Sequence, residues 1–126
     1  NKENYMKTTN FLQNLVRIAG TIQLISGFVF WSGNAEALVP MHMLLGSILT
    51  LALFGLAYQA YRAKVTPWLV ILAVVWGIGL PVWGILQEKI FPGSYNWISQ
   101  VLHLVCGLGA IGLAEILAMR IKKNAR

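Results

Sequence analysis

The sequence is poor in the residues that most soluble enzymes and secreted scaffolds depend on. It has one cysteine, Cys106, so no disulfide can form within the chain. Charged residues make up only 11% of it. We find no phosphate-binding glycine loop, no nucleophile–base–acid set and no nucleic-acid motif. These absences argue against a hydrolase, a nucleotide-binding domain or a nucleic-acid-binding protein.

The sequence is instead rich in long apolar stretches. Hydrophobic residues make up 57% of the 126 residues, and the mean hydropathy is +0.65. The apolar residues gather in four stretches, 11–31, 38–61, 68–86 and 97–119. Each holds roughly 20 residues, the length that an α-helix needs to cross the hydrocarbon core of a bilayer. The sequence predicts one all-α domain over 1–126, an integral membrane four-helix bundle with up-down-up-down topology.

The basic residues predict the orientation of that bundle. They cluster near the start of the chain, between the second and third stretches, and at the end: Lys2, Lys7, Arg17, Arg62, Lys64, Arg120, Lys122, Lys123 and Arg126. The positive-inside rule then places both termini in the cytoplasm of a bacterial or archaeal cell. Trp31, Trp68 and Trp97 end three of the stretches, as interfacial anchors do.

Two histidines lie inside the predicted spans, and each has a glycine four residues later: His42 with Gly46, and His103 with Gly107. The second and fourth helices run in the same direction and are diagonal in the bundle. At a rise of ~1.5 Å per residue, the two histidines differ in depth by only ~3 Å. We therefore expect the imidazoles to face each other across the outer half of the bundle.

Two opposed imidazoles suit a haem iron, which takes a nitrogen ligand on each face of a flat macrocycle. Glycine one helical turn away, at Gly46 and Gly107, would let a porphyrin edge approach the backbone. Zinc fits less well, because the sequence offers no third histidine. These residues predict a metal and cofactor site, His42, His103, Gly46 and Gly107, that holds one haem b per chain towards the outer face.

Other readings of the histidines stay open. Either imidazole can hydrogen-bond a neighbouring helix, or the pair can handle protons, since ionisable residues inside a membrane are functional by default. Another pigment or metal is a third possibility. Met41 and Met43 flank His42 but do not share its helix face, so we read them as packing residues.

The two histidines also carry a resemblance. The arrangement resembles one half of haem A synthase, a family of membrane b-type cytochromes built from two four-helix bundles with ligand histidines on the second and fourth helices. The resemblance implies haem binding at His42 and His103. This chain has one bundle, has Val39 where the family carries a carboxylate, and lacks the family's cysteine pair. Because of these differences, the resemblance implies that the chain binds haem and argues against haem modification by this chain alone.

A second pair of residues lies near the inner face. Glu115 is twelve residues after His103, and Arg17 lies at a similar depth in the first helix. Because the first and fourth helices are neighbours, we expect an ion pair between them. The alternative is a proton route, as in small multidrug transporters. Those chains carry their essential glutamate in the first helix, where this chain has none within the span.

The function predicted from the sequence is electron transfer by a membrane b-type haem protein, more an electron carrier or complex subunit than an enzyme. The predicted partners are the bilayer, a membrane protein or a second copy, and a quinone. The alternatives are a cofactor-free or pigment-binding subunit of a respiratory or photosynthetic complex, a haem-modifying enzyme, and a small transporter. An absorption spectrum separates most of these.

Overall fold

The structure, a computed structural model, describes residues 2–33 and 36–125. Four long helices account for most of them: α1 (Lys2–Trp31), α2 (Val39–Arg62), α3 (Pro67–Ile90) and α4 (Asn96–Asn124). Short 3₁₀ turns, η1 (Glu36–Leu38) and η2 (Gly93–Tyr95), precede α2 and α4. Arg126, one of the basic residues used for the orientation, lies outside the described residues.

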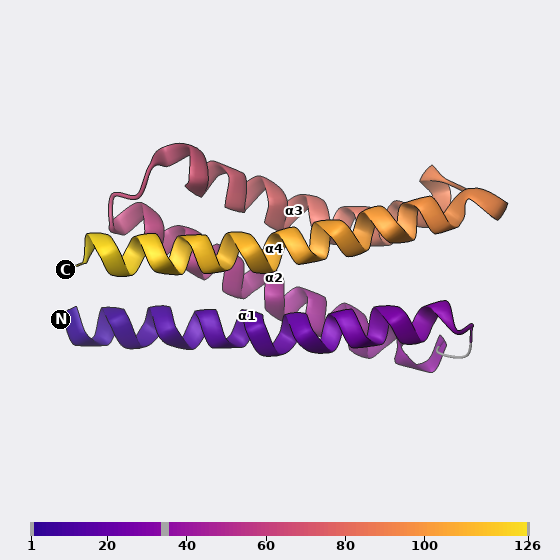
Figure 1. Cartoon of the computed structure of the whole chain (residues 1–126), viewed down its shortest axis with the longest axis horizontal. Coiled ribbons are helices and arrows are strands. Elements are labelled where there is room, and N and C mark those ends of the chain that lie inside the picture. The colour runs from indigo at the N-terminus through magenta and orange to yellow at the C-terminus, as the bar shows by residue number, and fades with distance from the viewer. Residues whose placement is uncertain (1, 34–35, 126) are drawn as a thin grey trace.

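The helices form the predicted up-down-up-down bundle. Each helix packs against its neighbours in the sequence, α1 closes the bundle against α4, and α2 also contacts α4 along the diagonal. Figure 1 shows both termini and the α2–α3 connection at one end, which we call the terminal end. The α1–α2 and α3–α4 connections lie at the other, which we call the loop end (Figure 1).

The helices are longer than the apolar stretches from which they were predicted. α1 begins at Lys2, nine residues before residue 11, because its polar first turns still pack on the bundle. Thr9 is fully buried there, and the Tyr5 hydroxyl donates a hydrogen bond to the Gln59 carbonyl of α2. Hydropathy locates the part of a helix that meets lipid, whereas the helix continues for as long as its backbone bonds and contacts last.

The apolar core occupies only part of the bundle. Every described buried hydrophobic side chain lies at the middle of the bundle or towards the terminal end, with Leu53, Leu56, Leu117 and Ile121 at its centre. At the loop end the buried side chains are instead polar, namely Ser26 and Ser99. The two halves of the bundle therefore differ: the described apolar core lies towards the terminal end, where Thr9 and Gln13 are also buried, and the described side chains buried at the loop end are serines.

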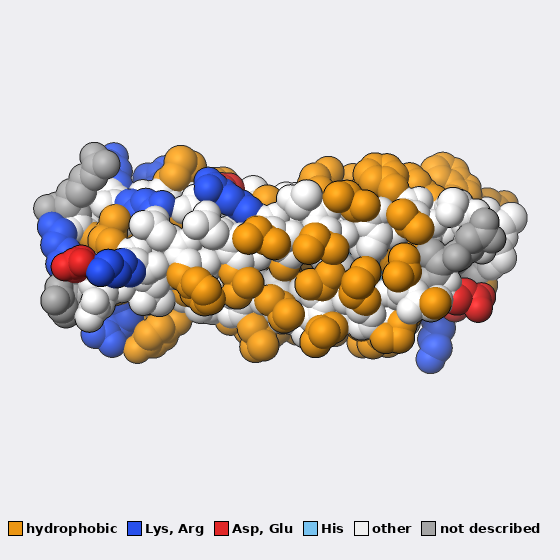
Figure 2. All heavy atoms as spheres, turned by 90° about the horizontal axis from the view of Figure 1, so that it is seen from below, with side chains coloured by type: hydrophobic (Ala, Val, Ile, Leu, Met, Phe, Trp, Pro, Cys, Tyr) orange, Lys and Arg blue, Asp and Glu red, His pale blue; other side chains and the backbone are white. Residues whose placement is uncertain are grey.

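The outer surface is that of a membrane protein. All four long helices are long and apolar enough to span a bilayer. Side chains such as Leu51, Ile71 and Ile85 point outward with about two thirds of their area exposed, as lipid-facing residues do (68%, 62% and 67%). Figure 2 shows an apolar belt on one face, with most of the Lys and Arg side chains of that face gathered towards the terminal end.

Candidate functional site

The structure brings the two predicted histidines together. His42 on α2 and His103 on α4 lie with their ring centroids 6.4 Å apart and their planes inclined by 49°. α2 and α4 lie on the diagonal of the bundle and contact each other directly, which agrees with the approach of the two rings. Both side chains are half-buried. The prediction that the imidazoles face each other across the bundle is confirmed.

His42 has partners that the sequence did not predict. Its Nδ1 lies 2.7 Å from the Ser26 hydroxyl of α1, which also lies 3.0 Å from the Gln23 carbonyl. The Phe30 ring stands edge-on to the imidazole at a centroid distance of 5.0 Å. Ser26 thus fixes one nitrogen of His42, and Phe30 fixes the plane of the ring.

His103 rests on a glycine of the third helix. A Cβ atom added to Gly84 would lie 3.0 Å from its Cε1 atom, so the ring packs directly on the α3 backbone. Its Nδ1 is buried and has no hydrogen-bond partner among the residues that the structure describes. Burying an unpaired ring nitrogen is costly, and such an atom indicates a place for water or a ligand.

The two predicted glycines, Gly46 and Gly107, differ in what lies beside them. The space beside Gly46 is filled by the Gln23 side chain of α1, whose Nε2 atom would lie 2.8 Å from a Cβ added to the glycine. Gly107 meets no described atom within 4 Å of such a Cβ. Gly46 therefore serves close approach of α1 to α2, and Gly107 leaves open space beside α4.

Further polar atoms without described partners lie near the histidines. The Ser99 hydroxyl is fully buried, one turn before His103 on the same face of α4, and the Asn96 side-chain oxygen precedes it by another turn. The Gln23 side-chain oxygen is likewise buried and unpaired within the described part of the chain. These atoms line the loop-end half of the bundle on α1 and α4.

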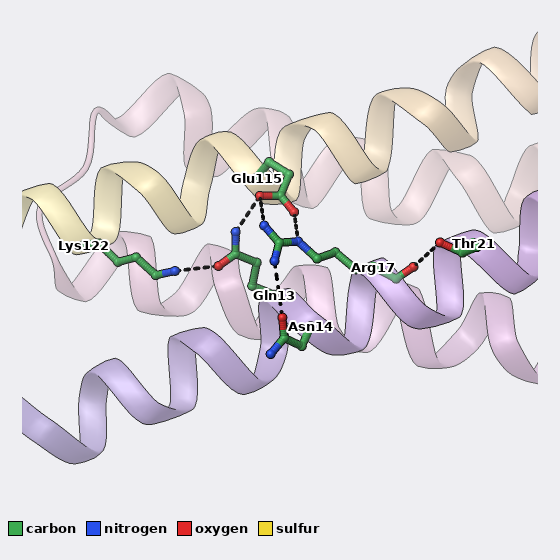
Figure 3. A network of polar contacts seen from close by, with 6 residues as sticks. All are labelled: Gln13, Asn14, Arg17, Thr21, Glu115 and Lys122. Carbon is green, nitrogen blue, oxygen red and sulfur yellow. Dashed lines mark hydrogen bonds and ion pairs between the residues drawn. The ribbon is translucent and has the colours of Figure 1, made fainter.

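A second polar site joins α1 to α4 between the middle of the bundle and the terminal end, and Figure 3 shows its side chains. The Arg17 guanidinium donates to both oxygens of the Glu115 carboxylate, Nε to Oε1 at 2.5 Å and Nη2 to Oε2 at 2.9 Å. Gln13 donates to Oε2 at 2.5 Å, and Lys122 donates to the Gln13 side-chain oxygen at 2.6 Å. The predicted ion pair is confirmed, with a bidentate geometry that suits arginine.

Three residues that support these two sites were not predicted from the sequence: Ser26 beside His42, and Gln13 and Lys122 beside the ion pair. A signal was present, because Gln13, Gln23 and Ser26 recur at helical spacing on the inward side of α1. The stripe is hard to see because Val16, Ala19 and Gly20 interrupt it.

The aromatic residues near the site brace α3 against α4. Trp76 donates its indole N–H to the Cys106 carbonyl at 2.9 Å, and Trp83 donates to the Ser99 carbonyl at 3.2 Å. Both indoles therefore lie in the α3–α4 interface. Cys106 is a half-buried free thiol.

Comparison with known proteins identifies one relative. A UPF0060 membrane protein of Desulfitobacterium hafniense (strain Y51) is 30% identical over 99 residues, covering 70% of this chain and 82% of the relative. No family model and no solved structure matches the chain.

The function predicted from the sequence, electron transfer by a haem protein, is wrong. So are two of its alternatives, the subunit of a respiratory or photosynthetic complex and the haem-modifying enzyme. The relative belongs to a family unrelated to haem proteins. Within residues 2–33 and 36–125, no group of three or more His, Cys, Asp or Glu side chains could hold a metal ion. The bound haem b and the quinone remain predictions that no observation here tests. The extent of the similarity instead places the chain in the UPF0060 family of membrane proteins.

Proposed function

We propose that this chain is a small proton-coupled membrane transporter whose proton site is the pair His42 and His103. The carrying observation is the contact of these two imidazoles, 6.4 Å apart, inside a membrane-spanning bundle. Histidine is the side chain that most readily gains and loses a proton near neutral pH. Ionisable residues within membrane spans mark ion and proton pathways.

The uneven packing of the bundle supports transport over a purely structural role. Polar atoms of Asn96, Ser99 and His103, which have no partner in the described part of the chain, follow one face of α4 from the loop end inward. They give water or a small polar solute a line of hydrogen-bonding positions that ends at the histidines. Beyond them the aliphatic core of Leu49, Leu53 and neighbouring residues closes the path. These polar atoms are buried in this structure, so the transport cycle we propose also includes opening of the loop end.

The ion pair contributes to the closed end. Arg17 and Glu115 join α1 to α4 within the closed half, and Gln13 and Lys122 extend the same link. Access from the terminal end requires α1 and α4 to separate, which breaks these bonds. The transport cycle we propose therefore includes opening of the Arg17–Glu115 contact.

The proposed orientation places the terminal end in the cytoplasm. The described basic residues except Lys89 lie towards that end, and positive charge favours the cytoplasmic side. Single-cysteine variants test this in a Cys106→Ser background. We expect a membrane-impermeant maleimide to label Lys89→Cys on intact cells, and Lys64→Cys only after permeabilisation. The reverse pattern would overturn the orientation.

We also propose that a second copy or another membrane protein covers the face of α1 around Arg17. The Arg17 side chain is 54% exposed within a candidate span, beside a groove that it lines with Ile18, Thr21 and Ile22. A charged side chain that faces lipid is costly even when it is paired, as Arg17 is with Glu115. Light scattering of the purified protein in detergent tests for a second copy, since one chain has a mass of 14.0 kDa.

The transport function is tested in liposomes that contain the purified protein and an internal pH dye. A potassium diffusion potential drives protons inward, with and without a panel of small cations, anions and neutral solutes outside. We expect faster acidification than in protein-free liposomes, and its loss in His42→Gln and His103→Gln. Ser47→Ala is the matched control, because the Ser47 hydroxyl faces outward on α2 and bonds only the Met43 carbonyl of its own helix among described residues. If the protein never acidifies the liposomes faster than the empty control, with any solute, the proposal fails.

A further inference from the structure

A groove of about 410 Å³ runs between α2 and α3 on the outside of the bundle, away from both polar sites. Tyr58 and Tyr61 line it from α2, and Val70, Val74 and Ile78 line it from α3. The three α3 residues recur every four positions, so the groove follows the helix axis for ~12 Å. In a spanning bundle this direction lies roughly along the bilayer normal, which is also the direction of lipid acyl chains.

The deep end of the groove is closed. The Phe54 ring, which also lines the groove, lies so close to Gly77 that a Cβ there would meet its Cε1 atom at 2.5 Å. Because α2 and α3 are antiparallel, Phe54 and Gly77 lie at one level, near the middle of the bundle, and Tyr61 and Val70 lie at the other, near the terminal end. The groove therefore begins near the terminal end and stops within the membrane.

Positive charge stands at the mouth of the groove. The Arg62 guanidinium donates to the Tyr58 hydroxyl at 3.0 Å, and its central carbon lies 5.9 Å from the centre of that ring. Lys64 follows in the α2–α3 connection, and α3 begins at Pro67, so the positive end of its helix dipole lies at the same level. Residues 54–78 contain no Asp or Glu. The mouth is therefore cationic with no acidic residue nearby in the sequence.

We propose that this groove binds an anionic phospholipid of the leaflet at the terminal end. One acyl chain lies along Val70, Val74 and Ile78, and the phosphate accepts hydrogen bonds from Arg62 and a tyrosine hydroxyl. Basic pockets between membrane helices recognise anionic headgroups in this way. A second copy in the same orientation would bring its own Arg62 and Lys64 to the same level, where like charges repel. A zwitterionic lipid carries a cation of its own that opposes Arg62.

Native mass spectrometry of the purified, detergent-solubilised chain tests the site. We expect bound phosphatidylglycerol to be retained at least several-fold more than phosphatidylcholine with the same acyl chains. Arg62→Gln and Tyr58→Phe should reduce this retention, because each removes a headgroup contact. Arg120→Gln is the charge control, since Arg120 is exposed near the same end but on α4. Inorganic phosphate and glycerol phosphate should fail to compete, since they lack the chain that fills the groove.

A second pair of variants tests the acyl-chain part of the groove. Val74→Trp fills the groove, whereas Val75→Trp places the same bulk on the lipid-facing side of α3, where Val75 is 60% exposed. We expect only Val74→Trp to reduce phosphatidylglycerol retention, with both variants helical by circular dichroism and eluting like the native chain. Equal retention of the two lipids, equal loss in Arg62→Gln and Arg120→Gln, or equal loss in both tryptophan variants would each overturn the proposal. So would a change in oligomer mass in Val74→Trp with lipid retention unaltered, because the groove would then hold a second copy.

Discussion

The Nδ1 atom of His42 lies 2.7 Å from the Ser26 hydroxyl, and this contact is what distinguishes His42 from His103. His42 has a polar partner on a neighbouring helix, whereas the buried Nδ1 of His103 has none among the described residues. Two imidazoles in contact therefore have different surroundings. In the proposed transport cycle, His103 is the one with a free nitrogen to offer water, a proton or a solute.

Removing the Ser26 hydroxyl should alter His42 alone. In Ser26→Ala, Nδ1 of His42 loses its partner, and we expect a loss of about 1 kcal/mol in stability, as for a typical hydrogen bond. Nitrogen-15 NMR of labelled histidine should show a changed tautomer balance at His42 with His103 nearly unchanged. Equal changes at both rings would mean that they share one hydrogen-bonded unit.

Breaking the ion pair should loosen α1 from α4. In Glu115→Gln the Arg17 guanidinium keeps a neutral acceptor but loses its counter-charge inside the span, so we expect the thermal midpoint to fall by several degrees. The double exchange Arg17→Glu with Glu115→Arg should recover much of the loss. Lys7→Gln is the control, because the Glu3–Lys7 pair is largely exposed and such pairs contribute little. If Lys7→Gln lowers the midpoint as much as Glu115→Gln, the α1–α4 pair has no special part in stability.

Truncating the closed end should weaken the whole bundle. Leu53 and Leu117 are fully buried, and replacing either by alanine leaves a cavity. We expect a cost of roughly 2 kcal/mol, at the low end of the range for such changes, because lipid solvates the separated helices nearly as well as the core does. Leu51→Ala, at a lipid-facing position, should change stability little. Unfolding in a denaturing detergent measures all three.

Two glycines of α4 should respond in opposite ways to alanine. A Cβ at Gly109 would meet the Trp76 ring at 2.7 Å, and this ring is held by its bond to the Cys106 carbonyl. A Cβ added to Gly107 would meet no described atom within 4 Å. We expect Gly109→Ala to destabilise the bundle and shift the tryptophan emission. Gly107→Ala should stabilise it by up to about 1 kcal/mol through helix propensity alone. A destabilised Gly107→Ala would show that this face of α4 is covered.

The sequence by itself determined the class of the protein and the topology of its helices. Four apolar stretches near 20 residues leave no other way to satisfy the backbone in lipid than four spanning helices, and short connections make neighbours antiparallel. The same reasoning correctly paired Arg17 with Glu115 and His42 with His103, because depth follows from residue count along a straight helix. It could not give the partners of each histidine.

Only the tertiary structure decided what surrounds these pairs. Helix rotation and close packing decide which neighbour fills the space beside Gly46, whether Ser26 reaches His42, and where in the bundle the apolar core lies. A rotation of a few tens of degrees leaves hydropathy unchanged but replaces every contact across the interface. The haem site was inferred from two histidines and two glycines, and their neighbours, Ser26, Gln23, Phe30 and Gly84, came only from the structure.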